Sequence, residues 1–488
     1  MIMNTYIGID LGTSSVKLLL VDKDGKILNS VTNEYPIYYP KSGWSEQDPS
    51  DWLKGTVDGI NKLLENTDRE CVKGVSFGGQ MHGLVMLDKD DNVIRPAILW
   101  NDGRTQKQTD HLNDVVGKDK LSEYTANIAF AGFTAPKILW VRENEPENFE
   151  KIAKIMLPKD YLAYMLTGTH SCDYSDASGM LLLDVKNKCW SKEMCKICHT
   201  DEKWLPKLFE SFEVIGNIKQ EYGLPNAVVT AGAGDNAAAA IGTGAVQNGD
   251  CNISLGTSGT VFIAKDEFSV DQNNSLHSFA HAGGKYHLMG CILSAASCNK
   301  WWMEDILGTA DFAREQSGLD LLLGNNDVYF LPYLMGERSP HNDTNARGCF
   351  IGMRPDTTRA QMTLAVMEGV AFALRDCIEV AKDSGVHISS AKICGGGAKS
   401  VVWRNIIANV FGVPVYTVSV EEGPAYGAAI LAMVGAGEYE SVEQATNNLV
   451  TTSSKIDPDD KILAKYNEKY NYFQKLYPAL KDVFALAK

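Results

Sequence analysis

The sequence predicts an α/β protein made of two similar halves. Strand-like stretches rich in β-branched and apolar residues alternate along the chain with stretches that carry apolar residues at helical spacing. The string Leu-Gly-Thr-Ser occurs at residues 11–14 and again at 255–258, and this 244-residue offset is half of the 488-residue length. Because both copies lie between two apolar stretches, we expect each half to begin with the same β-hairpin.

The first half contains the elements that follow from this pattern. The hairpin strands flank a Gly/Thr/Ser turn, and the Asp24-Gly25 turn separates them from a third strand. In chain order we predict strands at 6–10, 16–22, 26–31 and 72–77, and helices at 134–143 and 160–165.

The second half repeats the hairpin at residues 252–263. Apolar residues recur at helical spacing over 360–381, a short strand at 392–394 leads into three glycines, and a helix is expected over 401–410. The stretch 472–488 is either a docking tail or a final helix interrupted at Pro478.

Composition and charge narrow the class of protein. The chain has 46 Lys and Arg against 61 Asp and Glu, a net charge of −15, with 44% hydrophobic residues, as in ordinary globular proteins. The acidic balance argues against nucleic acid or an anionic membrane surface as a partner. The sequence shows neither an 18-residue apolar run nor a signal peptide, and its eleven scattered cysteines fit free thiols, so we expect a cytoplasmic protein.

The two hairpin turns are candidate phosphate sites. Glycine leaves backbone N–H groups accessible, and the hydroxyls of Thr13, Ser14, Thr257 and Ser258 add donors. Asp10 ends a strand beside the first turn and could hold Mg²⁺, usually through water. For either turn alone, a tight turn with a solvated aspartate is the simpler interpretation. Two copies facing a cleft would hold a polyphosphate from both sides.

A second glycine-rich loop, Gly232-Ala233-Gly234-Asp235-Asn236, lies between a strand at 228–230 and an alanine-rich helix. The pattern resembles a dinucleotide fingerprint, but Asp235 would oppose a pyrophosphate and the next acid, Asp250, comes early. Ionised aspartate is stabilised at a helix N-terminus, which suits a proton acceptor. Alternatively, Asp235 only caps the helix.

Residues 393–400, Ile-Cys-Gly-Gly-Gly-Ala-Lys-Ser, fail the P-loop pattern because Ala398 stands where glycine is required. Three glycines between a strand and a helix would allow a flat group such as adenosine to lie against bare backbone. The alternative is a tight strand-to-helix connection.

Polar residues suited to a polyol gather in two stretches. Gln80, Met81 and His82 follow the strand at 72–77, and Trp100-Asn101-Asp102-Gly103-Arg104 comes next. Each sugar hydroxyl both donates and accepts hydrogen bonds, which such side chains satisfy. A lone histidine is more often a core residue, so His82 is singled out only with its neighbours. Cys195, Cys198 and His199 match a haem-attachment string, but without a second cysteine pair we assign them no ligand.

The ordered motifs together resemble the FGGY family of carbohydrate kinases, and within it the xylulokinase group. The resemblance spans residues 10–404 and rests on DLGTSSVK (10–17), GWSEQDP (43–49), GQMHG (79–83), ILWNDGRT (98–105), GFTAPKILWV (132–141), LPKDYL (157–162), GDNAAAAIG (234–242), SLGTSG (254–259), PYLMGERSPHN (332–342) and GGGAKSVVWR (395–404). It implies two ribonuclease-H-like domains of the actin, hexokinase and Hsp70 type around a cleft, with expected boundaries 1–246 and 247–488.

The resemblance also implies roles for individual residues. Asp235 would be the catalytic base and Asp10 would position Mg²⁺ through water. The phosphates would be bound by the two turns, Gly12, Thr13 and Ser14 and Gly256, Thr257 and Ser258. Adenosine would be bound at Gly396 and Gly397. The ketose would be bound by Met81, His82 and Asn236. The chain departs from the family at Ala233, where many members have glycine, and in its slightly long start, Met1–Thr5.

The activity implied is ATP-dependent phosphorylation of D-xylulose to D-xylulose 5-phosphate in xylose catabolism, with a homodimer as a further expectation. Related kinases acting on ribulose, gluconate or glycerol are the alternative. An Hsp70- or actin-like ATPase would share the two hairpins, but the polar cluster around His82 and Trp100 argues against it. The hypothesis of a nicotinamide dehydrogenase is supported by Gly232 and Gly234 alone.

Overall fold

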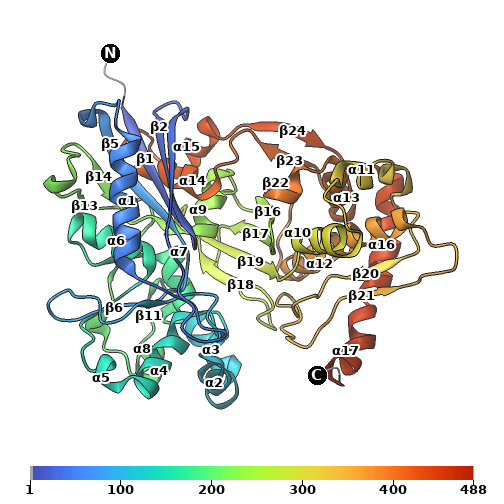
Figure 1. Ribbon diagram of the computed structural model, residues 1–488, viewed down its shortest axis with the longest axis horizontal. Coiled ribbons are helices and arrows are strands. Elements are labelled where there is room, and N and C mark those ends of the chain that lie inside the picture. Colours follow the sequence, from blue (N-terminus) through green and yellow to red (C-terminus); the bar gives the residue numbers. More distant parts are fainter. Residues whose placement is uncertain (1–3, 487–488) are drawn as a thin grey trace.

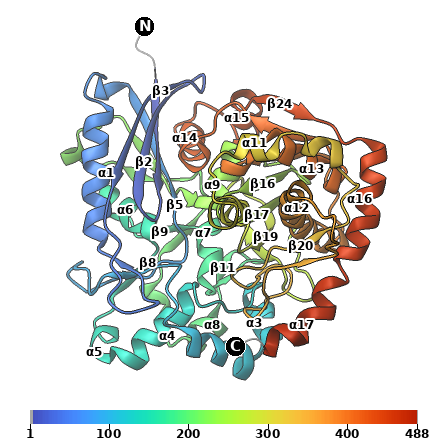
Figure 2. The ribbon, with the colours of Figure 1, turned by 45° about the vertical axis from the view of Figure 1, so that its right-hand side comes forward.

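The computed structural model describes residues 4–486 and confirms the α/β class. Two large mixed β-sheets occupy the two halves of the molecule, and helices pack against them (Figure 1 and Figure 2). Met1–Met3 of the N-terminal extension, Ala487 and Lys488 lie outside the described residues. Among residues 4–486, no helix is both long and apolar enough to cross a membrane.

The first sheet contains the predicted N-terminal hairpin. Its order is β13-β14-β5-β1-β2-β3, and the short β15 also pairs with β5. Neighbours β1, β5 and β14 run parallel, whereas β2, β3 and β13 are antiparallel to their partners. The strands are β1 (Thr5–Leu11), β2 (Ser15–Asp22), β3 (Ile27–Glu34), β5 (Val72–Gly79), β13 (Val214–Asn217), β14 (Val228–Thr230) and β15 (Ala233–Gly234).

The second sheet repeats this topology. Its order is β18-β19-β17-β16-β22-β23-β24, so β16, β17, β19, β22 and β23 take the places of β1, β2, β3, β5 and β14 with the same strand directions. The strands are β16 (Cys251–Leu255), β17 (Gly259–Lys265), β18 (His277–Ala280), β19 (Tyr286–Ile292), β22 (Ala391–Cys394), β23 (Val415–Val418) and β24 (Thr452–Ile456). The matching order supports the internal repeat inferred from the Leu-Gly-Thr-Ser strings.

A long insertion follows β5 and forms the lower left part of Figure 1. Its core is apolar and includes α4, whose residues from Thr134 to Val141 are all buried. The helices up to β13 are α1 (Pro49–Leu63), which precedes β5, and then α2 (Gln106–Asp110), α3 (Lys118–Thr125), α4 (Thr134–Asn144), α5 (Pro146–Phe149), α6 (Pro158–Thr167), α7 (Tyr174–Ala177) and α8 (Lys192–Ile197). Four two-stranded pairs complete this half: β4 (Glu46–Gln47) with β7 (Ala97–Ile98), β6 (Val85–Leu87) with β8 (Lys154–Met156), β9 (Ser171–Asp173) with β12 (Lys207–Phe209), and β10 (Leu183–Asp184) with β11 (Cys189–Trp190).

The second half is organised around one long helix. Thr358 caps α12 (Arg359–Asp383) in a reciprocal capping box with Gln361, and most of the helix is buried in the apolar core beside the second sheet. The other elements here are α10 (Ala296–Lys300), α11 (Phe312–Gln316), β20 (Tyr329–Leu331), β21 (Cys349–Ile351), α13 (Val401–Phe411), α15 (Val442–Leu449), α16 (Asp460–Phe473) and α17 (Leu476–Leu486).

The C-terminal stretch differs from its prediction. The helix break lies between Phe473 and Leu476, not at Pro478. Pro478 instead occupies the first turn of α17. Backbone N–H groups in the first turn of a helix have no intrahelical acceptor, so proline, which lacks this group, does not break a hydrogen bond there. The described part of the stretch, 472–486, therefore contains the end of α16 and then the helix α17, and its side chains Phe473, Tyr477 and Phe484 are buried in the core of the second half.

Two helices, α9 (Asp235–Gly242) and α14 (Gly423–Gly435), connect the halves. α14 comes from the second half of the chain, yet it packs on β1 and β5 of the first sheet and on α9. A Cβ on Gly8 of β1 would overlap the Ala425 carbonyl oxygen and lie 2.6 Å from Ala429 N. The boundary at residue 246 falls between α9 and β16 and stays a prediction, since the two halves share this helix layer.

We therefore expect Gly8→Ala to lower the free energy of unfolding by about 2–4 kcal/mol, because the added methyl group meets rigid backbone rather than a flexible side chain. Gly216→Ala is the control in the same sheet, where a Cβ would meet Thr169 Oγ1 at an ordinary 3.5 Å. Urea unfolding measures both. Equal stability of the two variants would contradict the close packing of α14.

Candidate active site

The predicted base and magnesium residues lie together at one edge of the first sheet. In register, Asp10 of β1 lies beside Gly78 of β5, and Gly234 of β15 lies beside Gly79. Asp235 follows β15 directly, and Gln80, Met81 and His82 follow β5. Because β1, β5 and β15 run parallel, their carboxyl ends carry Asp10, Asp235 and the GQMHG segment at the same edge.

Asp235 is the first residue of α9, with Gly234 at the N-cap position, so its side chain is not the helix cap. Its Oδ1 accepts hydrogen bonds from Asn236 N at 2.7 Å and Asn236 Nδ2 at 2.8 Å. Burial raises the pKa of Asp235 to about 6, although these hydrogen bonds oppose the shift. A carboxylate with this pKa is ionised at pH 7 and accepts a proton more readily than an ordinary aspartate.

Asp10 is coupled to this carboxylate. Burial and then the negative charge of Asp235 raise the pKa of Asp10 to about 7, whereas Lys17 opposes the shift. Lys17 is the cross-strand neighbour of Asp10 and forms an ion pair with Glu422. The site therefore gathers more acidic groups than one lysine can neutralise, which favours a bound cation.

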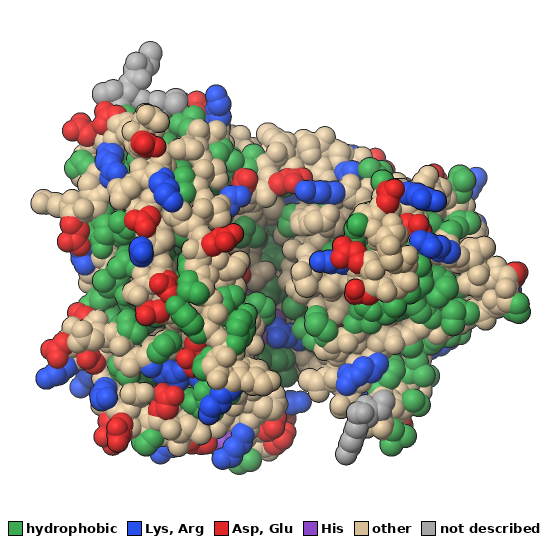
Figure 3. All heavy atoms as spheres, in the orientation of Figure 1, with side chains coloured by type: hydrophobic (Ala, Val, Ile, Leu, Met, Phe, Trp, Pro, Cys, Tyr) green, Lys and Arg blue, Asp and Glu red, His purple; other side chains and the backbone are tan. Residues whose placement is uncertain are grey.

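Both aspartates line a cavity of about 340 Å³ between the two halves, and the face drawn in Figure 3 is hollowed between these halves. The first half and α9 contribute Asp10, Lys17, Asp235 and Asn236. The opposite wall comes from the second sheet and the start of α14, with Asn252, Ser254, Thr260, Phe262, Cys394, Gly395, Val418, Val420, Glu421, Glu422, Gly423 and Pro424. Sequence patterns did not single out Lys17 or Glu422, because only the fold brings them to Asp10.

The donor set fits a magnesium ion that arrives with a phosphate ligand. Within residues 4–486 there is no group of three or more His, Cys, Asp or Glu side chains placed to hold a metal by themselves. The Asp10 carboxylate would offer an oxygen ligand through water, and Mg²⁺ at phosphoryl-transfer sites typically takes its remaining ligands from phosphates and water.

Cys195 and Cys198 are buried, and burial raises the pKa of Cys195 to about 11, so their thiols are protonated near neutral pH.

A larger cavity, about 810 Å³, lies next along the same strand ends. Gly256 and Thr257 of the second hairpin line it together with Gly396 and Gly397. Their roles in phosphate and adenosine binding stay predictions. The remaining lining residues are Ala296, Ser297, Asn299, Lys300, Phe312, Ala313, Gln316, Lys399, Ser400 and Trp403. Ser254 and Gly395 line the smaller cavity while Gly256 and Gly396 line the larger one, so the two cavities adjoin.

The first hairpin turn lies differently. Among the described residues, Gly12, Thr13 and Ser14 are not part of either cavity lining. Thr13 is held by neighbours instead: its carbonyl oxygen accepts from Gln47 Nε2 at 2.7 Å and its Oγ1 accepts from Trp100 Nε1 at 3.0 Å. Phosphate binding by this turn stays a prediction.

Met81 packs beside the loop that carries Asp235, and His82 follows it in the chain. A Cβ on Gly234 would be 2.9 Å from Met81 Sδ, so Met81 packs directly against the residue before Asp235. His82 has a left-handed backbone, φ 68°, and its carbonyl oxygen accepts from Lys137 Nζ at 2.8 Å and Thr134 Oγ1 at 3.1 Å. These two donors from α4, which sequence reasoning did not identify, hold the strained residue in place.

The ring of His82 has a defined protonation state. Its Nδ1 lies 2.8 Å from the Gly179 carbonyl oxygen, which can only accept, so Nδ1 carries the proton. Burial, and then the charge of Lys137, lower the pKa of His82 well below its usual value, so the ring is neutral. Nε2 is then a hydrogen-bond acceptor for a hydroxyl group.

Two residues of the second polar stretch, Asp102 and Arg104, bind each other rather than facing a polyol pocket. A pocket role for Trp100 and Asn101 stays a prediction. Asp102 accepts from the guanidinium of Arg104 through both carboxylate oxygens, and Arg104 also pairs with Glu46 at 2.7 Å. The Arg104 guanidinium stacks on Trp44 at 3.7 Å, and both charged side chains are buried. Asp102 and Arg104 satisfy each other in this structural cluster. Trp100, half exposed, is the residue of this stretch that reaches Thr13.

Comparisons with known proteins agree with this geometry. Residues 5–242 match the model of the N-terminal domain of the FGGY family of carbohydrate kinases, and residues 251–436 match that of its C-terminal domain. The chain is 38% identical to the xylulose kinase of Escherichia coli over 494 residues, covering 98% of this chain and 100% of that protein.

Solved structures show the same fold. The crystal structure of a xyloylose kinase from Brucella ovis superimposes with a TM-score of 0.93 at 38% identity, covering 98% of this chain and 100% of that one. A gluconate kinase from Lactobacillus acidophilus gives a TM-score of 0.95 at 26% identity, with both chains covered completely. The two-domain actin- and hexokinase-like architecture is thus confirmed, whereas fold similarity does not separate one sugar from another.

The raised pKa of Asp10 predicts that this residue destabilises the fold at neutral pH. A carboxyl that titrates near 4 when unfolded and near 7 when folded binds more protons in the folded state, so stability falls as pH rises through this window. We expect Asp10→Asn to raise the free energy of unfolding by about 1–3 kcal/mol at pH 8, and by less near pH 5. Urea unfolding without nucleotide or divalent cation measures this.

Asp90→Asn, at an exposed aspartate, is the control and should not change stability at either pH. An Asp10→Asn protein that is less stable than wild type at pH 8 would show that Asp10 is not electrostatically strained.

Proposed function

Because the chain belongs to the FGGY family of carbohydrate kinases, it is a sugar kinase, and we propose that it transfers the γ-phosphoryl group of ATP to D-xylulose. The observation that carries this proposal is the arrangement of Asp235 beside Met81 and His82 at one sheet edge, with an adjoining cavity large enough for a nucleoside. Full-length similarity to curated xylulose kinases at 36–38% identity supports D-xylulose over other sugars.

In this proposal Asp235 is the general base. Its carboxylate accepts the proton of the sugar O5 hydroxyl as this oxygen attacks the γ-phosphorus, and ADP leaves on the opposite side. Asn236 holds the carboxylate through two hydrogen bonds, and His82 offers Nε2 as an acceptor to another sugar hydroxyl. Most of the rate enhancement then comes from positioning and charge compensation rather than covalent chemistry.

The nucleotide lies, in this proposal, across the two adjoining cavities. Adenosine occupies the larger cavity against Gly396 and Gly397, and the phosphates extend past Gly256 and Thr257 toward Asp235. A magnesium ion bound with the phosphates would be held by Asp10 through water and would neutralise phosphate charge. This placement also gives the acidic pair a counter-charge.

We further propose that the reaction belongs to xylose catabolism in the cytoplasm. All eleven cysteines lie within the described residues as free thiols, as expected in a reducing compartment. A homodimer stays a prediction.

Gluconate is the second candidate substrate, because a gluconate kinase has the same fold and the fold alone does not separate the two sugars. A panel of D-xylulose, L-xylulose, D-ribulose, L-ribulose, D-gluconate and glycerol, with Mg-ATP and coupled detection of ADP, separates the candidates. We expect the highest kcat/KM with D-xylulose, and a loss of kcat of about 10²-fold or more in Asp235→Asn, as for other general bases. A preference for gluconate, or full turnover by Asp235→Asn, would overturn the respective assignment.

The adenosine cavity is tested separately at Gly396. Its backbone φ is not left-handed, and a Cβ there would meet open space. We expect Gly396→Val to project into the cavity and raise the KM for ATP about tenfold or more, while the KM for D-xylulose and the midpoint of unfolding stay near wild type. An unchanged KM for ATP would show that adenosine does not bind in this cavity.

A further inference from the structure

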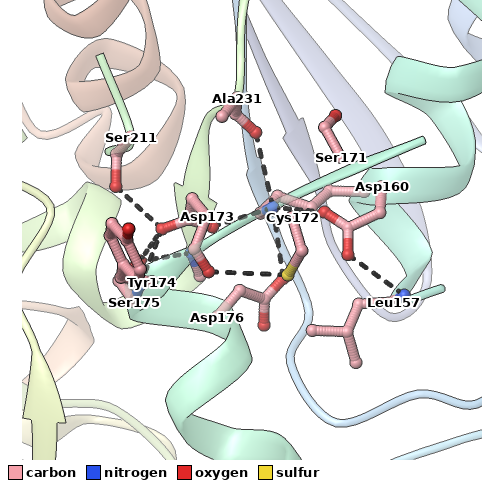
Figure 4. Close-up of polar contacts among 12 residues, drawn as sticks. Leu157, Asp160, Ser171, Cys172, Asp173, Tyr174, Ser175, Asp176, Ser211 and Ala231 are labelled. Atoms are coloured by element: carbon pink, nitrogen blue, oxygen red, sulfur yellow. Dashed lines mark hydrogen bonds and ion pairs between the residues drawn. The ribbon is translucent and has the colours of Figure 1, made fainter. Parts of the chain in front are cut away.

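A buried lysine surrounded by three carboxyl groups lies behind the strand that carries the base. Lys159 of α6 is fully buried, and its Nζ lies 2.6 Å from Asp160, 2.8 Å from Asp173 and 3.6 Å from Asp176. Figure 4 shows these carboxyl groups gathered around one another. In the described residues, neither carboxyl oxygen of Asp176 has a hydrogen-bond partner, and burial raises its pKa well above the usual value. Asp173, in contrast, accepts three hydrogen bonds.

Asp173 links Lys159 to the hydroxyl groups of two serines. Its Oδ1 pairs with Lys159, while its Oδ2 accepts hydrogen bonds from the backbone N of Ser175 at 2.8 Å, from Ser175 Oγ at 2.5 Å and from Ser211 Oγ at 2.7 Å. Figure 4 shows Ser175 and Ser211 reaching the same carboxylate from different segments. All three residues are almost fully buried. The three hydrogen bonds that converge on Asp173 Oδ2 restrict the position of Ser175.

The network ends on the backbone just before Asp235. Ser175 Oγ donates its proton to Asp173, so it is free to accept the Gly234 N–H at 3.2 Å. Lys159 Nζ lies 3.4 Å from the Ala231 carbonyl oxygen at the other end of the same loop. The loop is glycine-rich, and Gly232 has a φ of 76°, so its own residues restrict its conformation little.

We propose that Ser175 is a positioning residue for the catalytic base, acting through its hydrogen bond to the Gly234 N–H, with Lys159 and Asp173 as the buried anchor. The peptide N–H that Ser175 holds belongs to the residue immediately before Asp235. Fixing it sets the direction in which the Asp235 carboxylate leaves the end of β15. This inference rests on the proposed role of Asp235.

A second contact of the same segment strengthens the inference. Residues 178–180 continue from α7, and the Gly179 carbonyl oxygen accepts from His82 Nδ1. A Cβ on Gly179 would collide with the His82 ring, so the two residues are in tight contact. One short segment therefore contacts both parts of the proposed site. Ser175 bonds to the residue before the base, and Gly179 bonds to the proposed sugar-binding histidine. A displacement of about 1 Å between such groups is enough to lower rates substantially.

The chain offers a matched control for this role. Ser211→Ala removes a hydrogen bond to the same Asp173 oxygen from an equally buried serine, but in the described residues the Ser211 hydroxyl does not contact Gly234. Ser175→Ala removes the bond to Asp173 and the acceptor for Gly234 together. Ser175→Ala should lose more stability than Ser211→Ala, because it also leaves the Gly234 N–H without its acceptor. Turnover is therefore compared under conditions in which urea unfolding shows both variants fully folded, so that a difference in kcat reports positioning rather than folding.

The experiment measures kcat and KM for D-xylulose and ATP, together with urea unfolding, for wild type, both variants and Asp235→Asn. We expect Ser175→Ala to lower kcat about tenfold with both KM values within about twofold of wild type, and Ser211→Ala to keep kcat within about twofold. Ser175→Cys, which keeps a weak acceptor of similar size, should give an intermediate kcat and serves if the alanine variant does not fold.

Equal kcat values for Ser175→Ala and Ser211→Ala, in a protein whose Asp235→Asn variant is inactive, would overturn the positioning role and leave the base intact. If Asp235→Asn keeps full turnover, the base assignment itself fails, so the two failures are distinguishable.

Discussion

The close approach of α14 to β1 determines how the two halves of the molecule lie. Gly8, Gly242 and Gly427 occupy positions where even one methyl group would meet backbone atoms of the neighbouring element. The alanine-rich sequences of α9 and α14 extend this tight contact along both helices. Rigid packing at this layer fixes the separation of the two sheets, and the cavity that contains Asp10 and Asp235 lies directly at its edge.

That position accounts for the electrostatics of the site. Carboxylates at the carboxyl ends of buried strands are partly removed from water, and two of them facing one cavity repel each other. The protein stores this unfavourable energy where phosphates and a cation are proposed to bind, and an occupied site would release it. A proton acceptor near pKa 6 is a direct consequence of the same burial.

Local patterns predict the elements and several site residues well. Both hairpins, the long helix over 360–381 and the placement of Gly396 and Gly397 follow from apolar periodicity and glycine spacing, since these signals are local. Asp102 and Arg104 show the limit of such patterns. Their spacing suited a polyol, but the fold places Glu46 and Trp44 against them, and an available carboxylate partner outweighs any solvent-facing role.

Lys159 shows the opposite case. In LPKDYL it looks like a surface lysine beside an acid, and only the packing of α6 against β5 buries it among carboxyl groups that lie more than ten residues away in the chain. Long-range pairings of this kind leave no periodic signal in one sequence. The base itself could be proposed from a glycine-rich loop, whereas what holds it could not.

The segment from Asp173 to Met180 explains why these contacts belong together. Ser175 meets the loop before the base, Gly179 meets His82, and Ser178 Oγ accepts the N–H of Ala280 in β18 of the second sheet at 3.0 Å. This segment, which contacts the loop before Asp235 and the His82 ring, is therefore also bonded to the second half, whose residues line the larger cavity. In-line transfer requires acceptor and donor to be aligned across two domains. In the proposed mechanism, a single buried segment bonded to both halves contributes to this alignment, because its three hydrogen bonds reach the loop before Asp235, the His82 ring and the second sheet.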